Sequence, residues 1–150
     1  MRIRIAIGVA FGLVAMLLVV NVRSSNAAPK ETGLQGVWTL SHGEAEGEAL
    51  GEKQLKDGEL IIQDDQYAVH LVDLGIIKGT QKLNSKAKPK TIDITDSTGP
   101  HKGETCLGIY ELDGNEFRVV FARAGQPRPA KFATVKGSGH WMHVWKKATK

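Results

Sequence analysis

Glycines at short intervals divide the chain from residue 28 onward into stretches in which apolar and polar residues alternate. Alternation with a period of two is typical of half-buried β-strands, and helical periodicity is almost absent. The one weak helical window, residues 48–56, contains Gly51 and predicts at most a turn or two between strands. The predicted strands are residues 36–40, 59–63, 66–73, 78–84, 91–96, 104–112, 116–123, 131–135 and 140–146.

One face of these strands is apolar, and we expect it to be buried. The residues that share this face within a strand are Trp38 and Leu40; Tyr67, Val69 and Leu71; Ile92 and Ile94; and Phe117, Val119 and Phe121. Strand 104–112 is apolar on both faces, which indicates either a central strand or a site of outside contact. Both readings stay open at this stage.

Short turns between consecutive strands predict an antiparallel meander. Asp113-Gly114 is a strong signal for a tight hairpin, because the central positions of such a turn favour positive φ. An open sheet of about eight strands would leave two exposed edges, whereas closure removes both. The predicted fold class is therefore all-β, a single antiparallel up-and-down barrel of about eight strands after an N-terminal signal segment. A barrel of this size is either filled by side chains or holds one small ligand.

Residues 1–27 have the pattern of a targeting segment. Arg2 and Arg4 precede an apolar run over residues 5–20, and Ser25-Asn26-Ala27 offers small residues for a signal peptidase. We expect cleavage after Ala27; the alternative is an uncleaved membrane anchor extended across Asn21. In either case residues 28–150 form the barrel domain and lie outside the cytoplasm, periplasmic or secreted.

Charge and cysteine content narrow the function classes. The chain of 150 residues has room for one domain and carries 20 Lys and Arg against 16 Asp and Glu. Without residues 1–27 the basic residues fall to 17, so a nucleic-acid partner is not expected. Cys106 is the single cysteine, which excludes an intramolecular disulfide and predicts a small buried apolar residue.

Five stretches resemble one known group of proteins. Leu34-Gln35-Gly36-Val37-Trp38 opens the first strand, and Trp145-Lys146-Lys147 closes the last. Residues 89–93, residues 103–114, and Arg128-Pro129 followed by Phe132 complete the match. Together they are similar to a lipocalin-like domain family of unknown function that is abundant in planctomycete bacteria, and the resemblance covers nearly all of residues 33–147.

The resemblance implies a barrel fold and export, and it carries no catalytic residues. It implies close backbone approach at Gly36, a plug at the closed end of the barrel for Trp38, and a cation partner for that indole at Lys146 or Lys147. The last strand departs from the aliphatic pattern of the family. Its aromatic stripe, Trp141, His143 and Trp145, predicts either the lining of a pocket or a packed or exposed final strand.

No constellation of catalytic or metal-binding residues can be recognised in the sequence. His140 and His143 lie three apart, which on a strand sends them to opposite faces, so a shared metal site is not expected. Nucleophile-elbow and metal-hydrolase motifs are absent from the sequence. We expect no cofactor. Arg123 and Arg128, in the segment 123–129, either meet an anionic group at the barrel mouth or keep that loop soluble.

Three functional hypotheses follow. In the first, the barrel binds a small apolar or amphipathic ligand such as a lipid, in a cavity lined by Tyr67, Val69, Ile92, Ile94, Tyr110, Phe117 and Val119. In the second, the barrel is solid and engages another envelope protein through its loops or the Trp141/Trp145 face. The third is a small hydrolase or isomerase, which requires a histidine or carboxylate pointing into a pocket. Contact with a membrane is expected only through an uncleaved N-terminal segment.

Overall fold

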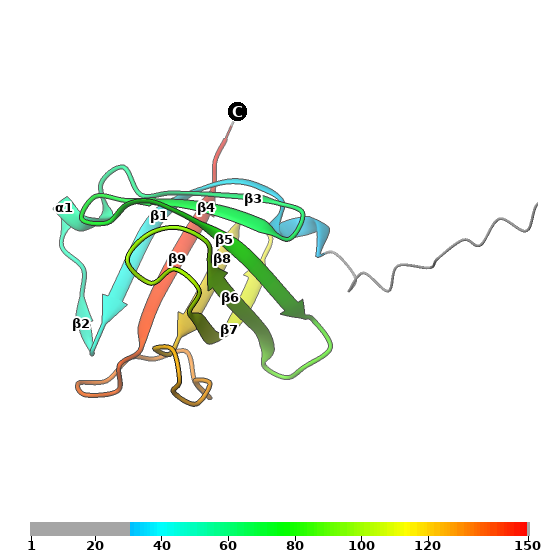
Figure 1. Ribbon diagram of the computed structural model, residues 1–150. Helices are drawn as coiled ribbons and strands as arrows, with labels where there is room; N and C mark the ends of the chain where they lie inside the picture. Colours follow the sequence, from blue (N-terminus) through cyan, green and yellow to red (C-terminus); the bar gives the residue numbers. More distant parts are fainter. Residues whose placement is uncertain (1–30, 150) are drawn as a thin grey trace, which may run out of the picture.

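The computed structural model describes residues 31–149, and within them nearly all regular structure is β-strand. A 3₁₀ turn, η1 (Thr32–Leu34), precedes the first strand, and one short helix, α1 (Glu52–Leu55), lies between strands (Figure 1). The strands are β1 (Gly36–Ala45), β2 (Glu48–Ala49), β3 (Glu59–Gln63), β4 (Gln66–Leu71), β5 (Gly75–Asn84), β6 (Lys90–Asp96), β7 (Thr105–Asp113), β8 (Glu116–Phe121) and β9 (Trp141–Lys147).

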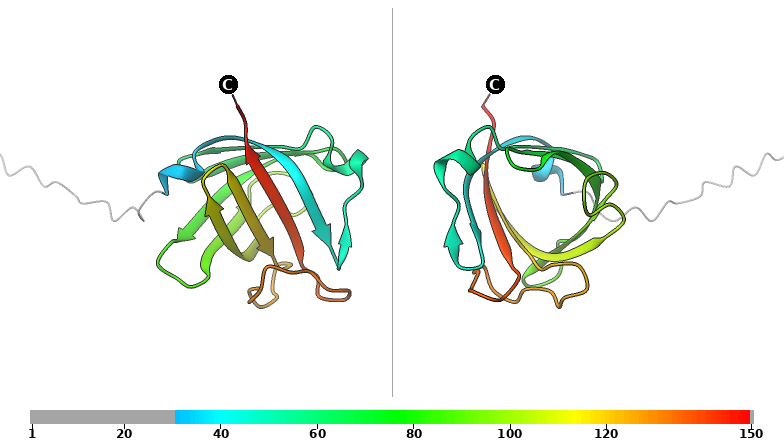
Figure 2. Two further views of the ribbon diagram at one scale, coloured as in Figure 1. Left: turned by 180° about the vertical axis from the view of Figure 1, so that it is seen from behind. Right: turned by 60° about the vertical axis from the view of Figure 1, so that its left-hand side comes forward.

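The strands form one closed antiparallel barrel. From β3 to β9 each strand pairs with the next in the chain, and β1 pairs with both β3 and β9. Eight strands therefore make the barrel wall, and β2 is a short extra strand at the end of β1. Figure 2 shows the closure, with β1 beside β9. The predicted up-and-down barrel is confirmed.

The tight hairpin between β7 and β8 lies one residue further along the chain than the sequence predicts. Asp113 and Glu116 are paired partners, so the two loop residues are Gly114 and Asn115. Gly114 has a φ of 55°, a conformation that glycine adopts without steric cost. The prediction of a two-residue hairpin is correct, but its central residues are shifted by one position, and only Gly114 of the two has a positive φ.

The inner face of the barrel holds the main core, as the alternation of apolar residues predicts. The largest side chains with almost no exposure on this face are Trp38, Tyr110, Phe117 and Trp145. Every residue assigned to the apolar face belongs to this core or packs against it. The short helical window is also confirmed, because α1 is four residues long and lies between β2 and β3.

A second, smaller core lies on the outside of the barrel. Ile109, Val120 and Met142 come from the outer faces of β7, β8 and β9, and Phe132 from the loop 122–140 packs against them. This loop answers the question raised by the two apolar faces of β7, because it covers the outer one.

The predicted strand at residues 131–135 is wrong, because the chain there forms no strand. Its alternation has another cause. Phe132 packs on the outer core, and the Oγ1 of buried Thr134 accepts a hydrogen bond from the Gly47 amide at 3.0 Å. The segment is a loop packed flat on the sheet.

The predicted signal segment, residues 1–27, lies outside the described residues. Within residues 31–149, no helix is both long and apolar enough to traverse a lipid bilayer.

Candidate functional site

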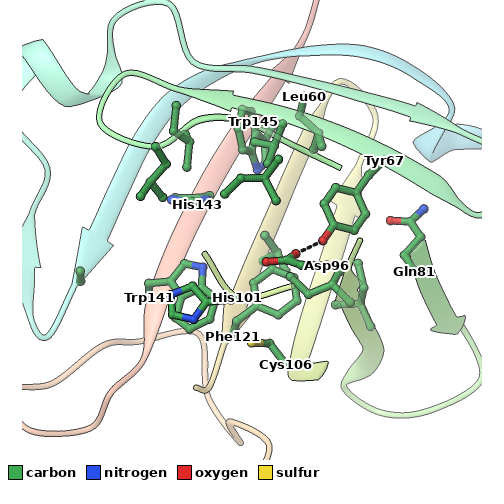
Figure 3. Close-up of a pocket in the computed structure, with 18 of the residues that line it drawn as sticks. Leu60, Tyr67, Gln81, Asp96, His101, Cys106, Phe121, Trp141, His143 and Trp145 are labelled. Carbon is green, nitrogen blue, oxygen red and sulfur yellow. Dashed lines mark hydrogen bonds between the residues drawn. The ribbon is translucent and has the colours of Figure 1, made fainter. Parts of the chain in front are cut away.

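A cavity of about 840 Å³ lies inside the barrel. Its walls come from the inner faces of the strands, and its mouth lies at the end where the loops after β4, β6 and β8 meet. Figure 3 shows side chains from strands all around the barrel converging on this space. The sequence leaves open whether the barrel is filled by side chains or holds a cavity. The structure has the cavity.

Six of the seven predicted lining residues line this cavity. They are Tyr67, Val69, Ile92, Ile94, Phe117 and Val119. The seventh prediction, Tyr110, is wrong. Tyr110 is completely buried near the closed end, where its ring packs edge-on against Phe117 and its hydroxyl donates to Glu31. Strand alternation gives the face of a residue but not its height along the barrel axis.

The closed end is sealed by Trp38, as the resemblance implies. Its indole N–H donates to the Leu34 carbonyl at 2.9 Å, and the Lys147 ammonium lies 4.4 Å from the ring centroid. Lys147 also donates to the carbonyls of Gly33, at 3.2 Å, and Gln35. A Cβ at Gly36 would meet the Lys147 ammonium at 3.4 Å, which agrees with the close approach expected there.

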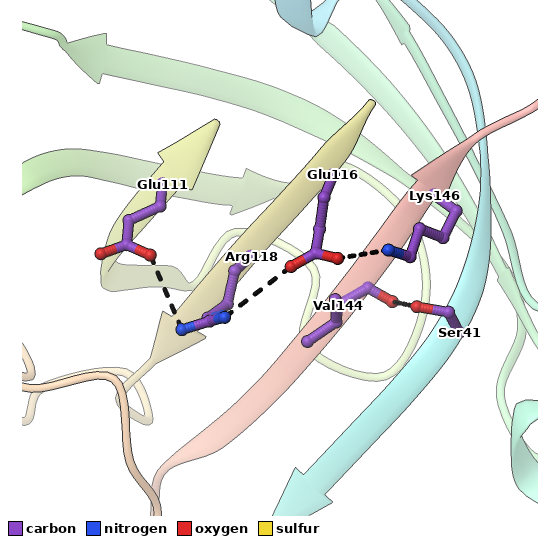
Figure 4. Close-up of polar contacts among 6 residues, drawn as sticks. All are labelled: Ser41, Glu111, Glu116, Arg118, Val144 and Lys146. Atoms are coloured by element: carbon purple, nitrogen blue, oxygen red, sulfur yellow. Dashed lines mark hydrogen bonds and ion pairs between the residues drawn. The ribbon is translucent and has the colours of Figure 1, made fainter. Parts of the chain in front are cut away.

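Lys146, the alternative cation partner of Trp38, points to the outer face of the barrel. Its ammonium contacts Glu116, and Arg118 links Glu116 to Glu111 at 3.7 and 3.6 Å (Figure 4). The neighbouring Lys146 ammonium lowers the pKa of the Glu116 carboxyl. Of the two predicted cation partners, Lys147 is therefore correct and Lys146 wrong, because adjacent strand positions face opposite sides and Lys147 lies on the inner one.

Several lining residues were missed at the sequence level. Leu60 and Ile62 of β3 alternate in the same way as the predicted residues, so the same rule would have found them. Phe121, although placed on the buried face, was not assigned to the cavity. Residues of the mouth, such as Leu74 and His101, lie in turns, where no periodic pattern marks them.

Tyr67 crosses the inside of the neighbouring strand. It is paired with Gly79 of β5, and Gly79 is paired with Asp96 of β6. Because Gly79 has no side chain, the ring passes over it and the hydroxyl donates to the Asp96 carboxylate (Figure 3). Burial and this carboxylate raise the pKa of Tyr67 above its usual range. The pair places one carboxylate in the wall of the cavity.

His143 faces the same cavity from β9. Its ring packs edge-on against Trp145, with ring centroids 5.5 Å apart. Burial lowers the pKa of the imidazole to about 4, so the ring is uncharged at neutral pH. The aromatic stripe Trp141, His143 and Trp145 therefore lines the pocket. The Trp141/Trp145 face points inward and does not form an outer docking surface.

Gln81 is a buried polar residue of the cavity wall. Its side chain is on the inner face of β5 and the residue is only 8% exposed. The amide nitrogen has no hydrogen-bond partner among the described residues. A buried polar group without a partner costs about 1–3 kcal/mol, so its presence calls for an explanation.

In the described part of the chain, neither the cysteine of the cavity nor a metal-binding cluster supplies a reactive group. Cys106 lines the cavity, but burial and the nearby Asp96 carboxylate raise the pKa of its thiol, which leaves it protonated. Within the described residues, no group of three or more His, Cys, Asp or Glu side chains could hold a metal ion.

The two arginines of the segment 123–129 have separate roles. Arg128 donates from Nη1 to the Asp93 carboxylate at 2.6 Å and to the Gly108 carbonyl at 2.8 Å, which ties the loop to the outer surface of β6 and β7. Arg123 lies at the cavity mouth, with a side chain 72% exposed and Nη2 3.7 Å from Glu46. Arg128 is therefore a structural anchor and not an anion receptor at the mouth.

Asp96 and His143 meet the geometric condition set for an enzyme, since both face the cavity. They do not form a recognisable catalytic pair, because the polar contact of Asp96 is with Tyr67 and the ring contact of His143 is with Trp145. The site is a mostly apolar cavity with the Tyr67–Asp96 pair in its wall and charged residues at its mouth, among them Asp73, Glu104 and Arg123. No protein-family model matches this chain, and no curated protein or solved structure does. The resemblance to a lipocalin-like family stays a prediction.

Proposed function

We propose that this barrel binds a small apolar or amphipathic molecule, of the size of a single lipid chain, inside its cavity. The observation that carries the proposal is the cavity of about 840 Å³ with walls of aliphatic and aromatic side chains. Ligand sites of small molecules are typically concave, mostly apolar and about 300–1,000 Å³ in volume. The rigid closed wall around the cavity favours a preformed site.

The location proposed for this function is outside the cytoplasm. The support is the sequence of residues 1–27, with its basic start, apolar run and small residues before position 28. A carrier in that compartment would hold poorly soluble molecules away from water. The lipocalin-like resemblance agrees with this role and adds no specific ligand.

Titration with a neutral fluorophore tests the proposal. N-phenyl-1-naphthylamine, whose emission rises in apolar surroundings, is added to the purified protein, and a lipid extract is then used to displace it. We expect saturable binding of one probe per chain and loss of the signal on displacement. A folded, monodisperse sample that shows no saturable binding would contradict the proposal.

Variants that narrow the cavity locate the binding. Val69 on β4 and Val119 on β8 both line the cavity, and the strand order places β4 and β8 on opposite sides of the eight-stranded barrel. We expect Val69→Trp to weaken probe binding at least tenfold, and Val69→Trp with Val119→Phe to abolish it. Val37→Trp is the matched control, because Val37 is on the outer face of β1 and 38% exposed. Equal binding by the control and the Val69 variant would place the probe outside the barrel.

A further inference from the structure

Two side chains in the cavity wall have hydrogen-bonding atoms that nothing in the described chain satisfies. Gln81 is more than nine-tenths buried and its amide nitrogen has no partner. His143 makes a ring contact with Trp145, and no hydrogen bond to its imidazole is present within residues 31–149. Gln81 comes from β5 and His143 from β9, so they approach the cavity from different parts of the wall (Figure 3).

Both groups are uncharged and can donate or accept. A primary amide has two donors and an acceptor oxygen, and a neutral imidazole has one of each. Rotation of the Gln81 amide by half a turn exchanges the donor and the acceptor that face the cavity. A ligand group that is itself both donor and acceptor, such as a hydroxyl, satisfies either orientation.

The charged groups that face the cavity are unfavourable for an anion. Asp96 is on the inner face of β6, and Glu104 lies next to it just before β7, at the mouth. Glu44 and Asp73 also line the cavity. Arg123 is the one arginine or lysine among the residues that line this cavity; its side chain is mostly in solvent and is paired with Glu46. A carboxylate inside the barrel would therefore meet a like charge and no buried cation.

The cavity is also unfavourable for a cation at the position of His143. Burial there lowers the pKa of the imidazole. An ammonium group in the same surroundings would lose its hydration in the same way. The free energy of transfer from water into the cavity is therefore more favourable for an uncharged head group than for a charged one.

We propose that the occupant of the cavity is an apolar molecule with an uncharged hydrogen-bonding head group, of the hydroxyl or primary-amide type, which bonds to Gln81 or His143. This inference rests on the proposed function and names the chemical class of its ligand. It excludes free fatty acids and alkylammonium compounds as the preferred occupants. The apolar body of the ligand contacts the aromatic and aliphatic walls.

A head-group series at constant chain length tests the inference. 1-Decanol, decanoate and decylammonium are each used to displace N-phenyl-1-naphthylamine at pH 7.5, below the concentrations at which they form aggregates. We expect 1-decanol to bind at least tenfold tighter than either charged compound. Decanoate or decylammonium that binds as tightly as 1-decanol overturns the inference and leaves the proposed function standing.

Variants connect the preference to the two side chains. Gln81→Leu with His143→Phe removes the hydrogen-bonding groups and keeps apolar bulk, and we expect it to weaken 1-decanol about tenfold. A thermal melt shows whether the double variant is folded. Each single variant is measured as well, so that the test stands if the double variant does not fold. Gln66→Leu with His42→Phe makes the same chemical changes on exposed positions of the outer face and should leave the affinity unchanged.

Charge is tested separately from hydrogen bonding. Asp96→Asn keeps an oxygen that accepts from the Tyr67 hydroxyl, and we expect it to strengthen decanoate about fivefold relative to 1-decanol. Glu111→Gln alters the net charge equally on the outer face and should not change this ratio. An unchanged ratio in the Asp96 variant overturns the inference, as does probe binding that none of the three compounds displaces. Failure of the probe itself to bind overturns the proposed function instead.

Discussion

Replacing Gly79 by alanine tests whether the Tyr67 ring is held across the neighbouring strand as described. A Cβ at Gly79 would lie 2.3 Å from the Thr95 carbonyl oxygen and 2.4 Å from the Tyr67 hydroxyl oxygen. Both separations are well inside van der Waals contact, so the ring must leave its place and the sheet must adjust. The hydrogen bond from Tyr67 to Asp96 is then lost.

The expected cost follows from these two effects. Overpacking of a tightly packed interior costs about 1–3 kcal/mol. A lost hydrogen bond to a charged acceptor costs about 1.5–3 kcal/mol. We therefore expect Gly79→Ala to lower the free energy of unfolding by about 4 kcal/mol. For a domain of this size, this loss corresponds to a fall in Tm of about 15 °C.

Two measurements check the prediction, thermal unfolding and the ultraviolet titration of tyrosine. The chain contains two tyrosines, Tyr67 and Tyr110. Burial and the Asp96 carboxylate raise the pKa of Tyr67, while burial and Glu31 raise that of Tyr110. Neither should ionise near pH 10 in the folded wild type. In Gly79→Ala we expect one tyrosine to ionise near pH 10.

Gly51→Ala is the matched control, because a Cβ there meets nothing closer than 3.8 Å and φ is −73°. We expect its Tm to stay within about 2 °C of the wild type. The reasoning is refuted if Gly79→Ala melts together with this control. It is also refuted if both tyrosines of Gly79→Ala remain protonated near pH 10.

Three further predictions concern other contacts of the barrel. Because burial lowers the pKa of His143 from 6.5 to about 4, the unfolded chain binds a proton on this residue before the folded chain does as the pH falls. The free energy of unfolding, measured in urea, should therefore fall by about 3 kcal/mol between pH 6.5 and 4, and His143→Phe should lack this loss. Lys147→Met removes the cation above Trp38 and should lower the free energy of unfolding by about 1–2 kcal/mol, whereas Lys146→Met on the outer face should change it by less than about 0.5 kcal/mol. Arg128→Ala frees the loop 122–140 from β6 and β7, and limited proteolysis should then cut this loop much faster than in the wild type.

The barrel itself could be predicted because its strands alternate with a period of two. Ile92 and Ile94 on β6, like Phe117 and Val119 on β8, point inward as their spacing requires. Closure followed from the number of strands and the cost of free edges. These are local patterns and general rules, which a single sequence contains.

The details of the site depend on information that alternation lacks. Tyr110 is on the correct face but too near the closed end to reach the cavity. The choice between Lys146 and Lys147 depends on the register of the last pairing, which closes over a separation of about a hundred residues. The polar pair of Tyr67 and Asp96 joins two strands across a third, and no spacing in the sequence indicates it.

The predicted strand at 131–135 shows how the same pattern can mislead. Its residues do alternate between covered and exposed, because Phe132 packs on the outer core and Thr134 contacts Gly47 in the turn between β1 and β2. Burial against an existing sheet imposes a period of two on any extended segment. Only the absence of a strand partner distinguishes this loop from a strand.

The pairing of β1 with β9 makes the first and last strands of the barrel neighbours. From β3 to β8, each seam joins strands that follow closely in the chain, so those hairpins can form as soon as each is synthesised. The last seam waits for residues 141–147, and until they arrive β1 and β8 keep open edges. A chain synthesised in order would therefore expose its apolar interior until the final strand is complete, which makes that strand the step at which folding and aggregation compete.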